Sequence, residues 1–286
     1  MWRPERYGYV VPFPRIPDSM GAKHAHNDLS LRPFGLFESD LEVDFHQKIY
    51  PHIVTQILTC CTRDKNGDTP DQTFFWDLTI GKRIECLLTI ATLGYVSDIT
   101  VRLRCLNKAC QQQIEIEVSM EELTNLQHQT ENRGYFDIRL DNEVLSIRRP
   151  TGGDQLEWLK GSFPDENVAV KVMIQKLVVN NKKDSSNQER NISEKWVKSI
   201  NKAMEELDPL INFNLLAQCP YCGKENQYEI NLEEFSLHKL REAQLSLLET
   251  VHRLAIYYHW SEQQIFSIPP WRRFHYLSLI EKKEDR

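Results

Sequence analysis

The chain has 286 residues, of which 41% are hydrophobic and 27% are charged, with a formal net charge of −6 and a pI near 5.9. This length allows one large hydrophobic core or two modest ones. The acidic balance argues against a general nucleic-acid coat, because phosphate binding needs clustered Lys and Arg. No window approaches the ~18 apolar residues of a membrane span. Seven cysteines, with no apolar secretory signal at the N-terminus, favour synthesis in the cytoplasm and argue against a disulfide framework.

The first segment, residues 1–35, is rich in Pro, Arg and aromatic side chains. Proline at this density prevents a regular helix and favours an extended arm. Two interpretations are open: a disordered tail, or an arm that docks on a neighbouring subunit. The disordered tail is the simpler interpretation, and the argument for the arm is that so many aromatic residues are unusual in a solvated tail.

Residues 36–123 are expected to contain an N-terminal helix and the first pair of spaced cysteines. Apolar residues recur at helical spacing over residues 78–94, with Gly94 where a C-terminal cap belongs. Residues 98–105 then alternate between apolar and polar side chains and predict a strand. The loop at 62–71 has its glycine at the fourth position, where an EF-hand needs the sixth. We therefore expect a turn there and not a calcium site.

Other cysteines and histidines are expected to have packing roles. Cys60, Cys61 and Cys86 have no metal-like spacing among themselves, so they predict core thiols. His252 and His259 lie in an aromatic stretch of a helical pattern, and we expect them to pack there.

Residues 124–210 are predicted as an insertion between the two halves of a cysteine site. A hairpin is expected over 134–150, with its turn at Asp141-Asn142. The RPTGGD motif that follows lacks the Lys-Ser/Thr of a phosphate loop and predicts the start of a helix at Thr151 or Asp154. The remaining elements are a helix over 166–179, a flexible linker over 180–191, and a helix that Ser193 caps and Pro209 stops.

Residues 211–286 are expected to hold the second cysteine pair and a helical C-terminal segment. The longest helical pattern covers 232–260 and would be roughly 40 Å long at about 1.5 Å per residue. Ser261 and Gln264 have the spacing of a capping box that restarts a helix. Pro270 then lies in the first turn of a last helix.

Four cysteines form two pairs that are far apart in the sequence: Cys105 and Cys110 as C-x4-C, and Cys219 and Cys222 as C-x2-C. The residues after each pair repeat as well. In both copies an isoleucine lies eleven positions after the first cysteine, in a short strand pattern, and a capped helix follows. The repeated residues are Ile116 and Ile230 in the strands, with Ser119…Glu122 and Asn231…Glu234 in the caps.

Two such knuckles that face each other make a tetrahedral site for Zn²⁺ with four thiolates, at Zn–S distances of about 2.3 Å. The closed ligand shell leaves no position for water, so the zinc would be structural, and its binding free energy would also be folding free energy. Two alternatives stay open: four free thiols at strand ends, and a site that has lost its metal because the C-x4-C half is loose. The sequence predicts an α+β fold with a split four-cysteine zinc ribbon, an α/β insertion and a helical C-terminal segment.

The sequence contains no Ser/His/Asp arrangement, no paired-carboxylate motif and no HExxH motif, so we expect no enzymatic activity. A zinc ribbon beside helical segments also occurs in nucleic-acid-binding regulators, and WRRF at 271–274 offers a small basic patch. The acidic total charge and the scarcity of Lys and Arg around the knuckles argue against that alternative.

The chain also resembles a known family. Residues 247–281 show a helix ending in YHWSE, then an I-x-x-I-P pattern, then arginines and YLSLI. The upstream motifs LTIGKRIECLLTIATLG, VRLRC, IRRPTGGDQLEWL, ELDPLINF and CPYCG occur in the same order, so that the likeness covers roughly residues 75–281. These motifs resemble the baseplate hub proteins of T-even contractile phages.

The resemblance implies a structural or assembly component of the baseplate of a phage-like contractile tail or contractile injection system. It implies no enzymatic activity. Its expected partners are other baseplate, hub, spike or tail-tube proteins, in a phage-tail-like particle. It also implies that Cys105, Cys110, Cys219 and Cys222 are metal ligands, although the C-x4-C spacing of the first pair departs from the usual two-residue gap.

Overall fold

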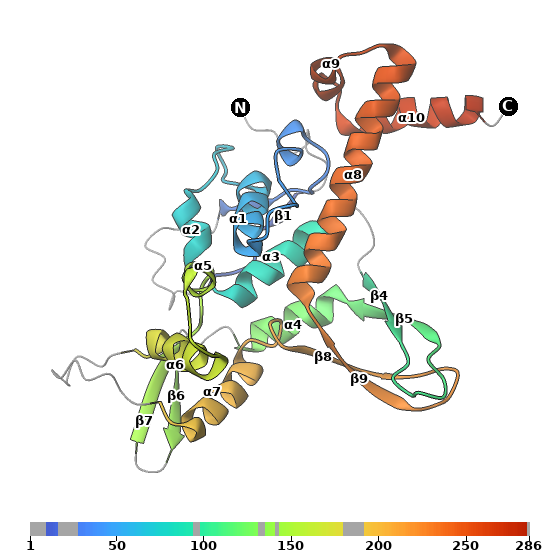
Figure 1. The fold of residues 1–286 in the computed structure, drawn as a ribbon. Helices are drawn as coiled ribbons and strands as arrows, with labels where there is room; N and C mark the ends of the chain where they lie inside the picture. The colour runs from blue at the N-terminus through green and yellow to red at the C-terminus, as the bar shows by residue number, and fades with distance from the viewer. Residues whose placement is uncertain are drawn as a thin grey trace.

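Helices and small antiparallel sheets alternate along the chain (Figure 1). The computed structural model describes residues 10–16, 28–93, 98–130, 135–140, 143–179 and 192–284. Within these residues one sheet has three strands, in the order β1-β2-β3, and the other three sheets are two-stranded hairpins. This mixture of helix and sheet confirms the predicted α+β class. None of the described helices is long and apolar enough to span a membrane.

The first hydrophobic core lies between three helices, the three-stranded sheet and the beginning of a fourth helix, α8 (Leu232–Tyr258). Its elements are β1 (Val11–Pro12), β2 (Ser30–Leu31), α1 (Tyr50–Cys61), β3 (Thr62–Arg63), α2 (Gln72–Asp77) and α3 (Ile80–Thr92). Phe13 and Phe34 are buried in this core. These two aromatic residues of the predicted arm therefore pack on the chain itself, and docking of the arm on a neighbouring subunit stays a prediction. The arm residues 1–9 and 17–27 lie outside the described residues.

Helix α3 confirms the helix expected over 78–94, and Gly94 lies outside the described residues. Cys61 and Cys86 are completely buried, and the half-buried Cys60 packs against the same core. The three cysteines without metal-like spacing are thus core thiols, as predicted.

Arg83 of α3 is fully buried, joins α3 to α1 and α2, and lies beside the start of α5 (Gly152–Lys160). Its guanidinium donates to the carbonyl oxygens of Phe75 and Pro51, each at 2.7 Å, and to Thr55 Oγ1 at 3.0 Å. A Cβ atom at Gly152, the first residue of α5, would lie 2.6 Å from Arg83 Nη1, so glycine is required there. Arg83 therefore joins α1, α2 and α3, and the start of α5 packs closely against its guanidinium.

A buried ion pair shapes the loop between β2 and α1. Arg32 and Asp40 are paired at 2.7 Å, and the Asp40 carboxylate also accepts hydrogen bonds from the backbone N–H groups of residues 35–37. Gly35 has a φ of 84°, and a Cβ atom there would lie 2.9 Å from Ala243 in α8. The carboxylate thus folds the loop into a shape that fits closely against α8.

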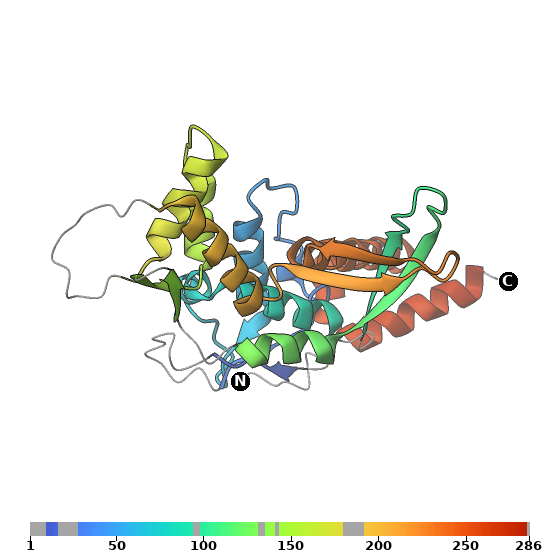
Figure 2. The ribbon, with the colours of Figure 1, turned by 90° about the horizontal axis from the view of Figure 1, so that it is seen from below.

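The insertion has a core of its own. It contains β6 (Tyr135–Leu140), β7 (Glu143–Arg148), α5 (Gly152–Lys160), α6 (Glu166–Leu177) and α7 (Glu194–Leu207). Strands β6 and β7 pair up to Leu140 opposite Glu143, which confirms the predicted hairpin, while the expected turn residues 141–142 and the linker expected at 180–191 lie outside the described part. Thr151 and Ser193 cap α5 and α7 through their side chains, which confirms both predicted helix starts. Figure 2 shows the insertion at the opposite end of the molecule from the β4–β5 and β8–β9 hairpins.

The C-terminal segment consists of α8 (Leu232–Tyr258), α9 (Glu262–Ser267) and α10 (Pro270–Glu284). Helix α8 runs from the hairpins along the first core, where Leu237 and Leu240 are buried, and continues beyond it (Figure 1). At its outer end, the predicted capping box of Ser261 with Gln264 is present. The domain boundaries expected at residues 36, 124 and 211 stay a prediction. Helix α8 belongs to the last of these predicted domains, but it packs against the first core.

The prediction that the two histidines of α8 pack among aromatic residues is wrong. His252 and His259 are exposed, and His259 ends the helix with a left-handed φ of 56°. The aromatic contacts instead join α8 to α10. Tyr258 stacks on Trp260 with ring centroids 4.6 Å apart, and Tyr276 meets both rings edge-on.

Candidate metal centre

Two antiparallel hairpins converge at their turns, away from the insertion (Figure 2). They are formed by β4 (Asp98–Arg104) with β5 (Gln113–Ser119), and by β8 (Phe213–Gln218) with β9 (Glu225–Ile230). Apolar side chains of both hairpins share one core. Each hairpin leads into a helix, α4 (Met120–Thr130) or α8, and Asn231 caps α8 by accepting the Glu234 N–H at 3.1 Å. The strand-to-helix repeat expected from the sequence is therefore present.

The two turns close in the same way. In each, the backbone N–H of the first cysteine donates to a carbonyl oxygen across the turn, at 2.9 Å. In each, the residue after the second cysteine has a positive φ, 50° at Gln111 and 69° at Gly223. The two turns differ in their cysteine spacing, C-x4-C and C-x2-C. They nevertheless have related backbone conformations at the residue that follows the second cysteine.

The four cysteine side chains meet where the turns face each other. Cys105 Sγ lies 3.7 Å from Cys222 Sγ, and Cys110 Sγ lies 3.8 Å from Cys219 Sγ. All four sulfur atoms lie within 4.8 Å of one another. A regular tetrahedron with Zn–S bonds of about 2.3 Å has edges of about 3.8 Å. The spacing and the soft donor set fit a four-thiolate zinc ion, so these four thiols form a group that can bind a metal ion.

Two residues that sequence reasoning missed join the hairpins beside the thiols. Asn226 of β9 is buried, and its Oδ1 accepts the backbone N–H of Leu106 at 3.1 Å and faces Cys105 Sγ at 3.8 Å. Tyr228 donates its hydroxyl to the carbonyl oxygen of Arg104 at 3.1 Å. A single polar residue in a strand carries no pattern, so these cross-links could be found only from the three-dimensional structure.

The thiols differ in their surroundings. Burial raises the pKa of the Cys105 thiol. The backbone of Lys224 and the side chain of Asn107, through hydrogen bonds, lower the pKa of the exposed Cys222 thiol to about 6. Cys222 is therefore mostly thiolate at neutral pH, which is the form that binds a metal cation.

Replacing Gln111 by glycine is expected to stabilise the protein by ~0.5–1 kcal/mol, because a residue with a side chain is strained at positive φ. The free energy of unfolding in urea measures this effect. Gly223→Ala, at the matching position of the other turn, is the control and is expected to destabilise by a similar amount. A stability loss in Gln111→Gly would contradict the equivalence of the two turns.

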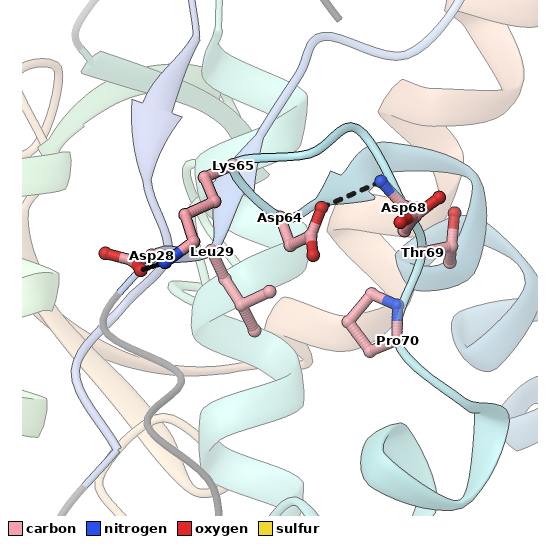
Figure 3. A pocket seen from close by; sticks show the side chains of 7 residues that line it. All are labelled: Asp28, Leu29, Asp64, Lys65, Asp68, Thr69 and Pro70. Atoms are coloured by element: carbon pink, nitrogen blue, oxygen red, sulfur yellow. Dashed lines mark hydrogen bonds and ion pairs between the residues drawn. The ribbon is translucent and has the colours of Figure 1, made fainter. Parts of the chain in front are cut away.

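A separate hollow of about 270 Å³ lies beside the loop at 62–71 (Figure 3). Two of its three acidic side chains are engaged within the chain. Asp28 pairs with Lys65 at 3.0 Å, and Asp64 accepts the backbone N–H of Asp68 at 2.8 Å. The Asp64 carboxylate closes a turn in this loop, as the sequence predicted.

The family described as T4 bacteriophage base plate protein matches residues 29–236 of the chain. The match contains the first core from β2 onward, both cysteine pairs and the insertion. It begins upstream of residue 75, where the resemblance in the sequence starts, and it ends before the motifs at 247–281. Neither the curated proteins nor the solved structures include a significant match. Because the matched residues make up most of its length, the chain belongs to the T4 bacteriophage base plate protein family.

Proposed function

We propose that this baseplate protein is a structural or assembly component of the hub of a contractile tail or contractile injection system, and that it carries a structural zinc ion. The arrangement of Cys105, Cys110, Cys219 and Cys222 is the single observation that carries the zinc proposal, because the edges of this sulfur tetrahedron match those of a zinc–thiolate site. Membership of the baseplate family supports the assembly role.

The zinc ion would act as a clasp between distant parts of the chain. Cys105 and Cys222 are 117 residues apart in sequence, and the insertion lies between them. Four protein ligands leave no open coordination position, so the metal would supply rigidity and no Lewis-acid chemistry. Asn226 and Tyr228 would hold the two hairpins in register around it. The closed ligand set and the membership of a baseplate family support the proposal of a non-enzymatic role.

The surface of the turns favours protein partners over nucleic acid. Leu106 in the first turn is 60% exposed, and Tyr221 in the second is 66% exposed. Large exposed apolar and aromatic side chains at adjacent turns are typical of protein contacts. The proposed partners are other baseplate, hub, spike or tail-tube proteins, and the proposed destination is a phage-tail-like particle after synthesis in the cytoplasm.

Metal analysis of protein purified without chelators is expected to find about one zinc per chain, as one closed four-thiolate site requires. A ratio near zero would contradict the zinc proposal. Co-purification with tail proteins from the producing cells tests the hub role separately. Recovery of spike, hub or tube proteins supports it. Salt-dependent retention on DNA without any tail protein would instead support a nucleic-acid-binding regulator.

A further inference from the structure

Helix α10 packs across the outer half of α8 (Figure 1), and Arg273 in its first turn is buried there with only 3% of its side chain exposed. Its Nη2 group donates a hydrogen bond to the carbonyl oxygen of Leu36, and its guanidinium lies 5.2 Å from the ring centroid of Phe266. Its Nε and Nη1 atoms are also buried, but they have no hydrogen-bond partner in the part of the chain that the structure describes. Buried polar groups are normally paired, so these two nitrogen atoms lack acceptors.

The carboxylate of Asp40 does not neutralise Arg273, because other groups already use it. Burial lowers the pKa of Arg273, and the negative charge of Asp40 opposes that effect. The same carboxylate is paired with the buried Arg32 at 2.7 Å and accepts the backbone N–H groups of residues 35–37, each at 3.0 Å. Two buried guanidinium groups therefore share one carboxylate, and the three side chains together keep a net positive charge. A buried charge is costly unless it is paired, so this group favours an anion from outside the chain.

A small hollow beside Arg273 has space for such an anion. Its volume is about 20 Å³, which is enough for one water-sized group. Arg273 is the one charged side chain among the residues that line it, and the others include Ser246 and Thr250 of α8 and Phe274 of α10. The hollow therefore presents a positive charge, and its lining holds no carboxylate that would compete for it. One oxygen atom of a carboxylate fits this volume and is the acceptor that a guanidinium binds most strongly.

We infer that this hollow, called the Arg273 site, binds one carboxylate group from an aspartate or glutamate side chain of a partner protein. The exposed rings beside it favour a protein as the source. Phe274 lines the hollow and is 49% exposed, and Trp271, three residues earlier on the same helix face, is 64% exposed. Trp and Arg are enriched at the energetic centres of protein interfaces, and a free ion would leave these rings uncovered. Arg273 lies beyond residue 236, where the family match ends, and the inference is independent of the zinc and hub proposals.

Thermal unfolding of the full chain in sodium formate tests the site, with formate as the smallest carboxylate probe. Binding to the native state is expected to raise Tm by about 2 °C or more at ten times the dissociation constant, beyond the general effect of the salt. Arg273→Met should lose this extra rise. Arg272→Met, which removes the same charge from the exposed neighbouring residue, is the matched control and should keep it. Ser246→Leu fills the hollow and leaves Arg273 in place, so it should also lose the rise, even if Arg273→Met does not fold.

Cross-linking in the producing cells tests the source of the carboxylate, with a photoreactive phenylalanine analogue in place of Trp271. We expect a cross-link to a partner segment that contains Asp or Glu. Arg273→Met should lower its yield by about tenfold or more, and Arg272→Met should leave it unchanged. A formate response that is equal in all variants would overturn the site. A formate response without a cross-link would assign the site to a free anion. That result, or a cross-link that Arg273→Met leaves intact, would overturn the partner protein.

Discussion

Cys222→Ser is expected to abolish zinc binding and to lower the free energy of unfolding by several kcal/mol, on the order of 5, because binding to the native site stabilises the fold by mass action. Cys222 is exposed, and an exposed thiol that holds no metal contributes almost nothing to stability. The size of the loss therefore reports metal ligation directly. Urea unfolding of the zinc-loaded protein, with and without a chelator, measures it.

Cys86→Ser is the matched comparison, because Cys86 is completely buried and lies outside the four-thiol group. Its replacement places a hydroxyl in an apolar core and is expected to cost at most ~1–2 kcal/mol. The zinc proposal thus predicts that the exposed cysteine matters more than the buried one. If burial alone governed the loss in the free energy of unfolding, Cys86→Ser would lose more than Cys222→Ser. That result would contradict the zinc proposal.

Arg83→Leu is expected to destabilise the protein by roughly 3–5 kcal/mol, because it leaves buried carbonyl groups without donors. The carbonyl oxygens of Phe75 and Pro51 and the hydroxyl of Thr55 all accept hydrogen bonds from Arg83. Burial lowers the pKa of Arg83 to about 10, an effect that the nearby Glu233 opposes, so the guanidinium remains charged at neutral pH. Thermal and urea unfolding both measure the loss.

Arg102→Leu provides the control for this change. Arg102 is paired with Glu115 at 2.7 Å, but both side chains are more than half exposed, and such a surface pair contributes at most about 1 kcal/mol. A stability loss at Arg83 no larger than the loss at Arg102 would show that the buried guanidinium does not hold α1, α2 and α3 together.

The sequence was informative wherever a signal lies within a few neighbouring residues. The side chains of Thr151, Ser193, Asn231 and Ser261 sit one turn before the N–H groups that they cap, so short motifs revealed four helix starts. The cysteine pairs were recognised by the repeat that follows them. Their approach to within 4.8 Å was inferred from the chemistry of zinc and is present in the fold.

Elements that are stabilised by contacts between residues far apart in the sequence were not predicted. Helix α1 (Tyr50–Cys61) begins after Ile49, which provides no side-chain cap, and its run of Ile, Val and Thr is equally compatible with a strand. Its stability comes from burial of one face in the first core. Strands β1 to β3 are two residues long and far apart in sequence, so no local pattern marks them. The burial of Phe13 depends on that sheet.

Helix α8 begins two residues after β9 ends, with only Asn231 between them, and it continues without interruption to Tyr258. Its 27 residues make it roughly 40 Å long. It is therefore a long, continuous connection between the hairpins and the helices at its outer end. A tilt of about ten degrees at its first turn displaces its far end by about 7 Å, which is more than one helical turn. Small changes in how the hairpins are held would thus be amplified into large movements of whatever is attached to the tip.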